Sequence, residues 1–144
     1  METIPPLFDK AFVGNLIPQK FPFVMIDKLF SFSDTSIVAG LNVTDDNIFV
    51  SNGTFVESGL IEHMAQSVAL HTGYQFYLKK EPAPTGYIGS IKEIEITQLP
   101  KLNDEIQTTV TILHEFAGIT LVELVSKVNE EVIATGQMKT ILAK

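Results

Sequence analysis

The most regular hydrophobic pattern in the chain lies between residues 55 and 77. Apolar and small residues recur there at steps of three and four, the spacing of an α-helix: Leu60, Ile61, Met64, Ala65, Val68, Ala69, Thr72 and Phe76. Thr54 and Glu57 have the spacing of a capping box at the start of this helix, and Pro82 and Pro84 limit its far end. Because the helix is apolar around much of its circumference, we expect other elements to enclose it.

Strand-like patterns lie on both sides of this helix. Residues 23–32 and 36–43 predict two strands joined at Ser33-Asp34, with a short helix at 8–13 before them. After the helix, alternating apolar residues predict four strands, near 88–96, 106–112, 119–125 and 132–141. Turn-forming pairs separate them, as in an antiparallel meander: Asn103-Asp104, Ala117-Gly118 and Asn129-Glu130.

This order of elements predicts one α+β domain spanning residues 1–144. A single sheet can bury so apolar a helix only by curling around it, so we expect a hotdog fold: a long central helix wrapped by a curved antiparallel sheet of about six strands. The curvature leaves one flank of the helix and one edge strand uncovered. Two identical chains can cover these for each other across a two-fold axis, so we expect a homodimer or a higher even oligomer.

The net charge limits the kinds of partner that we expect the protein to bind. The chain has 10 basic and 17 acidic residues, a net charge of -7, and no basic run longer than Lys79-Lys80, so nucleic acid is not an expected partner. The same charge opposes an acidic carrier protein or coenzyme A unless lysines gather locally. The candidates for such a cluster are Lys20, Lys28, Lys79, Lys80 and Lys92. Lys79 and Lys80 fit equally well as residues that complement the dipole at a helix C-terminus.

The residue inventory excludes several kinds of chemistry. The chain has no cysteine, which excludes disulfides, thiol catalysis and thiolate metal ligands. Its three histidines are scattered along the sequence, so neither a metal site nor a cofactor is predicted. The apolar runs are far shorter than the roughly 18 residues of a membrane span, and the first six residues lack the features of a signal peptide. We therefore expect a cytoplasmic protein with no membrane partner.

Two motifs resemble the 3-hydroxyacyl-acyl-carrier-protein dehydratases of fatty-acid and polyene pathways. Residues 16–28, Leu-Ile-Pro-Gln-Lys-Phe-Pro-Phe-Val-Met-Ile-Asp-Lys, resemble that family's Leu-Pro-His-Arg-Tyr-Pro-Phe-Leu-Leu-Val-Asp-Arg. Residues 61–66, Ile-Glu-His-Met-Ala-Gln, resemble its Glu-Ala-Met-Ala-Gln, and even more the Glu-Tyr-Met-Ala-Gln of the aryl-polyene and flexirubin-type members. Residues 87–91 and 102–104 fall where the family has a glycine-containing substrate strand and a Pro-Gly-Asp turn. The resemblance covers about residues 16–111.

The resemblance implies dehydration of a 3-hydroxyacyl thioester, linked to acyl-carrier protein or coenzyme A, to the enoyl thioester. This reaction needs a base for the α-proton and an acid for the departing hydroxyl. The family's helix glutamate corresponds to Glu62 and faces the substrate across a dimer interface. The family's second catalytic residue, the histidine of Gly-His-Phe-Pro-Gly, is absent, because residues 50–55 read Val-Ser-Asn-Gly-Thr-Phe. Asn52 or Ser51 is the candidate to position substrate or water in its place.

Other candidate residues surround Glu62. Gln66 lies one turn later, at about 40° around the helix, so its amide could orient the carboxylate or a substrate carbonyl, or could simply be a polar residue at a wet interface. Backbone N–H groups at the positive end of the helix dipole could polarise the thioester carbonyl. The candidates for this substrate contact are Gly53, Thr54 and Gly59. Gly53 could equally be a turn residue alone, and Gly89 is a substrate-binding candidate on the substrate strand.

The histidines do not replace the missing base. His63 lies about 100° and His71 about 180° around the helix from Glu62, so neither shares its face. A packing or interface role is favoured for His63. His114 has the strand phase of Ile106, Val110 and Ile112, which predicts an inward-facing, hydrogen-bonded side chain.

Two alternatives to the dehydratase remain open. A hotdog acyl thioesterase needs only a helix carboxylate to activate water, and so tolerates the absent histidine. A non-catalytic acyl-binding protein, or the silent half of a heteromeric dehydratase, would rely on a partner for the histidine. Release of free thiol would identify the thioesterase, and rescue by a partner would identify the heteromer.

Overall fold

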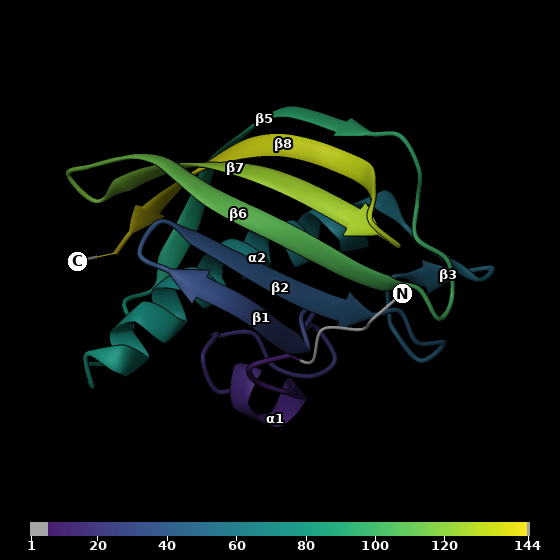
Figure 1. Cartoon of the computed structure of the whole chain (residues 1–144), viewed down its shortest axis with the longest axis horizontal. Helices are drawn as coiled ribbons and strands as arrows, with labels where there is room; N and C mark the ends of the chain where they lie inside the picture. Colours follow the sequence, from purple (N-terminus) through teal and green to yellow (C-terminus); the bar gives the residue numbers. More distant parts are fainter. Residues whose placement is uncertain (1–5, 144) are drawn as a thin grey trace.

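The computed structural model describes residues 6–143 and contains one long helix and one large sheet (Figure 1). The elements before and including the long helix are α1 (Lys10–Val13), β1 (Lys28–Ser33), β2 (Ser36–Asn42), β3 (Val50–Ser51), β4 (Thr54–Phe55) and α2 (Glu57–Leu78). Four strands follow it: β5 (Gly86–Ile96), β6 (Glu105–Phe116), β7 (Ile119–Val128) and β8 (Glu131–Leu142). The short helix and the four later strands lie where the sequence predicts them.

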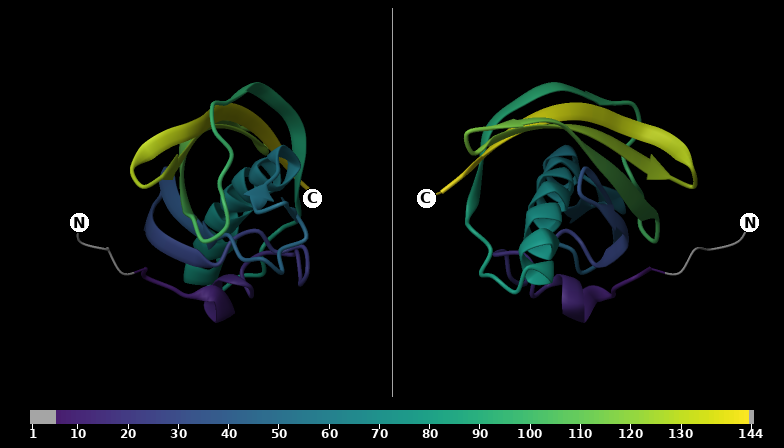
Figure 2. Two further views of the ribbon diagram at one scale, coloured as in Figure 1. Left: turned by 90° about the vertical axis from the view of Figure 1, so that its right-hand side faces the viewer. Right: turned by 60° about the vertical axis from the view of Figure 1, so that its left-hand side comes forward.

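Six strands form a single antiparallel sheet in the order β1-β2-β6-β7-β8-β5. The sheet curls around α2, and Figure 2 shows the helix lying inside the arc of strands. Strands β3 and β4 form a separate hairpin beside the start of α2. This arrangement confirms the α+β hotdog fold with a central helix and six sheet strands.

The pairing differs in one respect from a simple meander. Strands β6, β7 and β8 form two successive hairpins. The turns of these hairpins contain residues with positive φ: Ala117, Gly118, Asn129 and Glu130. Strand β5 does not pair with β6, the next strand in sequence, but lies at the sheet edge against β8. Strand β2 takes the place beside β6, from Ser36 opposite Thr111 to Asn42 opposite Glu105.

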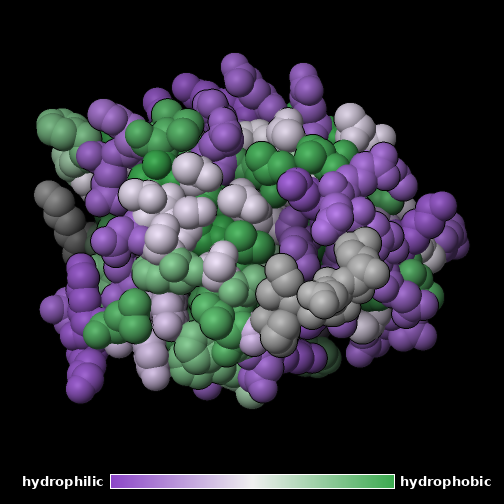
Figure 3. Space-filling view, in the orientation of Figure 1, coloured by the Kyte–Doolittle hydropathy of each residue, from purple (hydrophilic) through white to green (hydrophobic). Residues whose placement is uncertain are grey.

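The core lies between α2 and the concave face of the sheet. Alternate residues of β6 point inward and are fully buried, because successive side chains of a strand face opposite sides. These inward residues are Ile106, Thr108 and Val110. On the outer face, Figure 3 shows hydrophilic side chains along the upper margin, where β5 and β8 run in Figure 1. The helix is thus enclosed by structure, as its apolar circumference predicts.

The start of α2 differs from the predicted capping box. The helix begins at Glu57 with Val56 as its N-cap, and no side chain caps it. Thr54 lies in β4, paired with Ser51. The hydrogen bond from the Val56 N–H to the Phe49 carbonyl (2.9 Å) holds the chain extended up to the first helical residue. The capping-box prediction is therefore wrong, because the β3–β4 hairpin holds Thr54 outside the helix.

The first predicted strand is also shorter than expected. Strand β1 begins at Lys28, and residues 23–27 belong to no strand. Two backbone groups of that segment bond instead to the side chain of Gln66 on α2: the Met25 N–H donates to Oε1 (2.6 Å), and the Phe23 carbonyl accepts from Nε2 (2.9 Å). The alternating pattern of residues 23–32 misled the prediction because a helix side chain, and not a neighbouring strand, satisfies this backbone.

Candidate active site

A cavity of about 150 Å³ runs along one face of α2, between the helix and the edge strands β5 and β8. The α2 residues that line it recur at helical spacing, and most are small: Glu62, Ala65, Val68, Ala69, Thr72 and Gly73. Small side chains on this strip leave the space that a larger residue would fill. Glu62 is the only carboxylate among the described residues that line the cavity, and no histidine lines it. An apolar trough with few polar groups is the typical form of a small-molecule site.

Gln66 fixes the orientation of the Glu62 carboxylate. Its Nε2 donates to Glu62 Oε2 (2.7 Å) and to the Phe23 carbonyl (2.9 Å), while its Oε1 accepts from the Met25 N–H (2.6 Å). Because a backbone donor and a backbone acceptor set which end of the amide is which, the NH₂ group must face Glu62. Gln66 is fully buried, so the alternative of a polar residue at a wet interface is wrong.

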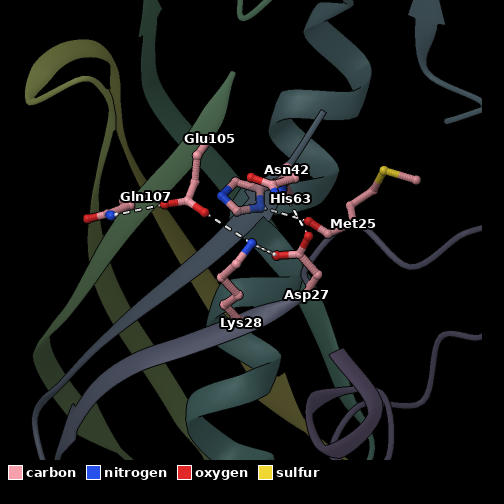
Figure 4. A network of polar contacts seen from close by, with 7 residues as sticks. All are labelled: Met25, Asp27, Lys28, Asn42, His63, Glu105 and Gln107. Carbon is pink, nitrogen blue, oxygen red and sulfur yellow. Dashed lines mark hydrogen bonds and ion pairs between the residues drawn. The ribbon is translucent and has the colours of Figure 1, made fainter. Parts of the chain in front are cut away.

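His63 extends this network away from the cavity, and Figure 4 shows its contact with Met25. Its Nδ1 lies 2.7 Å from the Met25 carbonyl and its Nε2 lies 2.8 Å from Thr108 Oγ1, which in turn lies 2.7 Å from Ser126 Oγ. The carbonyl can only accept, so Nδ1 carries the proton and Nε2 accepts from the Thr108 hydroxyl. The His63 side chain is therefore committed to packing α2 against the sheet.

Burial lowers the pKa of His63 from 6.5 to about 4, against the opposing effect of its hydrogen bond to the Met25 carbonyl. The imidazole is therefore neutral near pH 7, with both ring nitrogens occupied. It cannot act as the missing base without breaking the network, in agreement with its predicted position off the Glu62 face. The sequence does not reveal that His63 is linked to Gln66 through the two backbone groups of Met25.

The other two histidines differ in burial. His71 is buried, places Nε2 2.9 Å from the Ser33 carbonyl and stacks on the Phe32 ring, and burial lowers its pKa. His114 is exposed, so the predicted inward position is wrong. A β-bulge between Ile112 and His114 shifts the register by one residue and reverses the phase of the strand.

The remaining candidate residues do not line the Glu62 cavity. Asn52 (φ 53°) and Gly53 (φ 75°) form the exposed two-residue turn of the β3–β4 hairpin, where both residues need positive φ. Gly59 lies in the first turn of α2 against Phe49 and Phe55, so that an added Cβ would come within 2.5 Å of Phe49 Cβ. Gly89 is exposed and lies at a bulge in β5.

Two of the candidate lysines for a carrier-binding cluster, Lys20 and Lys28, make contacts within the chain. Lys20 Nζ donates to the carbonyls of Gly14 (2.8 Å) and Ile17 (3.1 Å). Lys28 Nζ lies between Asp27 (3.1 Å) and Glu105 (3.0 Å), an ion-pair network visible in Figure 4. Both ammonium groups are thus engaged within the chain.

Two buried polar atoms have no hydrogen-bond partner within the part of the chain that the structure describes. They are Gln19 Oε1 and Ser90 Oγ. Gln19 also lines the cavity that contains Glu62. Sequence reasoning missed it, although it lies inside the dehydratase-like signature at residues 16–28, because burial of a single amide atom is visible only in three dimensions.

Within residues 6–143, no group of three or more histidine and acidic side chains is arranged to hold a metal ion. No α-helix in the same range is both long and apolar enough to cross a membrane.

The chain is similar to known proteins in both sequence and fold. A family model described as ApeP-like, ApeP dehydratase, matches residues 12–144. The 3-hydroxyacyl-[acyl-carrier-protein] dehydratase FabZ of Vibrio cholerae is 27% identical over 133 residues, covering 88% of this chain and 86% of the relative. FabZ of Yersinia enterocolitica is 25% identical over 130 residues, covering 86% and 77%.

Solved structures share the fold at low sequence identity. A chain of the dehydratase heterocomplex ApeI:P from Xenorhabdus doucetiae superposes with a TM-score of 0.85 at 18% identity, covering 92% of this chain and 91% of that chain. A hypothetical thioesterase with coenzyme A from Streptococcus pneumoniae gives 0.66 at 12% identity, covering 81% and 84%. The match over residues 12–144 decides the family: the chain belongs to the ApeP-like dehydratases.

Proposed function

We propose that this protein dehydrates a 3-hydroxyacyl thioester to the enoyl thioester in fatty-acid or polyene-type biosynthesis, with Glu62 as the residue that moves the proton. One observation carries the proposal: Glu62 is the only carboxylate among the described residues lining an apolar cavity, and buried Gln66 fixes its orientation. The similarity to dehydratases over most of the chain supports the same reaction.

The reaction needs two proton transfers, and the cavity offers one carboxylate for both. Glu62 would take the α-proton, and the electron pair of that C–H bond would form the C2–C3 double bond. Protonated Glu62 would then give the proton to the departing 3-hydroxyl, which leaves as water, and the carboxylate is restored. General acid–base transfers of this kind contribute about 10²–10⁴-fold to a rate.

In the proposed enzyme, Asn52 and the backbone N–H groups at the start of α2 also contact the substrate, and Asn52 does so across an interface between two chains. The Asn52-Gly53 turn is exposed and lies outside the cavity of its own chain, so we place its action, with that of Thr54, in the cavity of a second chain. In the first turn of α2, the N–H groups of Glu57, Ser58 and Gly59 precede the first i→i−4 bond, and no side chain caps them. They are the donors proposed for the thioester carbonyl, while Gly89 on β5 would contact the acyl chain.

The proposed substrate carrier is acyl-carrier protein or coenzyme A, and the proposed assembly is a homodimer or a complex with a related hotdog chain. Strand β5 supports assembly because it is a sheet edge with mostly exposed residues, including Tyr87, Ile88 and Ile91. The structural match to a chain of a dehydratase heterocomplex supports a related partner, which could supply a histidine that this cavity lacks.

A thioesterase is the second candidate. The observation that favours it is the same solitary carboxylate, which could activate water without help from a histidine, together with the fold shared with a hypothetical thioesterase.

The deciding experiment incubates the purified protein with a 3-hydroxyacyl carrier-protein thioester and follows enoyl product and free thiol in parallel. The dehydratase proposal expects enoyl product that Glu62→Gln abolishes, because glutamine keeps the shape of the side chain but cannot carry the proton. Free thiol without enoyl product would favour the thioesterase. Absence of both products would contradict catalysis by this chain alone, and the assay would then be repeated with a co-purified hotdog partner.

A further inference from the structure

Gln19 lines the cavity that contains Glu62, and its side-chain amide carries a buried oxygen without a partner among the described residues. Its Oε1 is buried and has no hydrogen-bond partner within residues 6–143. The side chain lines the cavity together with Glu62, Ala65 and Ala69. A buried polar atom without a partner destabilises the folded state, so its presence on a residue that lines a ligand-sized cavity points to a ligand toward which the amide can turn.

The segment that carries Gln19 is held firmly against α2. The carbonyl of Leu16 packs so closely on Gly73 that a Cβ at position 73 would overlap it. Lys20, directly after Gln19, donates to the carbonyls of Gly14 (2.8 Å) and Ile17 (3.1 Å). The contacts on either side of Gln19 therefore fix the backbone from which its side chain enters the cavity.

We infer that Gln19 recognises the 3-hydroxyl group of the acyl substrate, an inference that rests on the proposed dehydratase function. Much of the cavity lining is apolar or small and suits an acyl chain. Beside Glu62, Gln19 supplies an amide from the 16–20 segment, and the other polar lining residues are the hydroxyl-bearing Thr72, Tyr87 and Thr140. The 3-hydroxyl donates to Gln19 Oε1, which orients its oxygen for the proton from Glu62. Gln19 is thus a specificity residue that separates hydroxylated acyl chains from saturated ones.

The test compares two probes that differ only in the hydroxyl: 3-hydroxyoctanoyl-pantetheine and octanoyl-pantetheine. Binding of each is measured calorimetrically to the wild-type chain, to Gln19→Leu and to Gln107→Leu. Gln107 is exposed on β6 and does not line the cavity, so the same substitution there is the matched control. Binding is measured instead of turnover, so that the result does not depend on catalysis.

We expect the wild type and Gln107→Leu to bind the hydroxylated probe about 10-fold more tightly than the saturated one, the worth of one hydrogen bond to a group that is otherwise unpaired. Gln19→Leu should bind both probes equally and have a melting temperature equal to or above that of the wild type, because leucine removes an unpaired amide and no hydrogen bond. A purely structural glutamine would instead lower the melting temperature and leave the preference unchanged.

Failure of the Gln19 inference and failure of the proposed function give different binding results. Persistence of the 10-fold preference in Gln19→Leu would overturn the inference, as would equal binding of the two probes by the wild type. In both cases acyl thioester binding, and hence the proposed function, would stand. Failure of the wild type to bind either probe would overturn the inference and the proposed function together.

Discussion

The two sides of α2 differ in whether their polar side chains have hydrogen-bond partners. Toward β6 and β7, His63 is fully buried, and both its ring nitrogens have partners in the Met25 carbonyl and the Thr108 hydroxyl. Toward β5 and β8, Gln19 Oε1 is buried without a partner, and Glu62 is held through one oxygen by Gln66. The first side has satisfied polar groups among large apolar residues, and the second has unsatisfied ones above small residues.

This difference separates the residues that hold the structure from those available to a ligand. A satisfied buried network resists change, because removal of one member leaves the others unpaired. An unsatisfied group beside a cavity has free hydrogen-bonding capacity to give to a substrate. Substitutions on the sheet side should therefore change the free energy of unfolding, and substitutions on the cavity side should change activity.

The strongest test of this division is Glu62→Gln. We expect enoyl formation to fall by about 10²–10⁴-fold, because glutamine cannot transfer the proton, while Gln66 can still bond to the new amide oxygen. The free energy of unfolding, measured by urea denaturation, should stay within about 0.5 kcal/mol of the wild type. A large loss of stability in this variant would show that Glu62 belongs to the structural side.

Acid pH should destabilise the sheet side through His63. Burial lowers the pKa of His63 in the folded protein to about 4, whereas the unfolded chain keeps about 6.5. Between these values the unfolded state binds a proton that the folded state does not, so stability is fully present above pH 6.5 and falls as the pH drops toward 4. The full change is about 3 kcal/mol.

Urea denaturation of the wild type and of His63→Gln at several pH values between 4 and 7 isolates this contribution. The difference in free energy of unfolding between the two proteins should shrink as the pH falls, because glutamine does not titrate. His71, whose pKa burial also lowers, is present in both proteins and cancels. Parallel pH profiles would contradict a neutral buried His63.

Gly73→Ala tests the contact that holds the Gln19 segment against α2. A Cβ at this position would overlap the Leu16 carbonyl, and backbone cannot move aside as easily as a flexible side chain. We expect a loss of about 2 kcal/mol in the free energy of unfolding, together with weaker binding of the hydroxylated probe as the Gln19 segment shifts. Unchanged probe binding in Gly73→Ala would argue against a fixed Gln19 segment.

Ala69→Leu should have only a small effect on stability. The residue is partly buried and lines the cavity, so the larger side chain fills space instead of displacing the core. We expect a change in the free energy of unfolding below about 1 kcal/mol and a shift toward shorter acyl substrates, measured as kcat/KM over a series of chain lengths. An unchanged chain-length profile would show that the acyl chain does not run along this strip.

The sequence predicts the fold well because two periodicities are strong. The three- and four-residue steps between 55 and 77 and the alternation after residue 86 give the central helix and the later strands. The errors lie where a side chain or a bulge overrides the local pattern. Gln66 takes the backbone bonds of residues 23–25 away from a strand, and the bulge before His114 turns that side chain outward.

The candidate site is predicted less completely. Glu62 and Gln66 follow from their motif and from the angle between them on the helix, and the structure places them in contact. Gln19 could not be predicted, because its significance depends on which atom of its amide is buried and on the absence of a partner among the described residues. Spacing along a sequence carries no information on hydrogen bonds that are not made.

The pairing of β2 with β6 has a consequence for the order of folding. Residues 36–42 bond to residues 105–111, so closing this contact encloses α2 and all of β5 in one long loop. Contacts between such distant residues form slowly, because the loop loses entropy before the pairing stabilises it. During synthesis, the β1–β2 hairpin has no neighbouring strand until about residue 111 leaves the ribosome, and the sheet around the apolar helix is complete only after β8 has also emerged, because β5 pairs with β8.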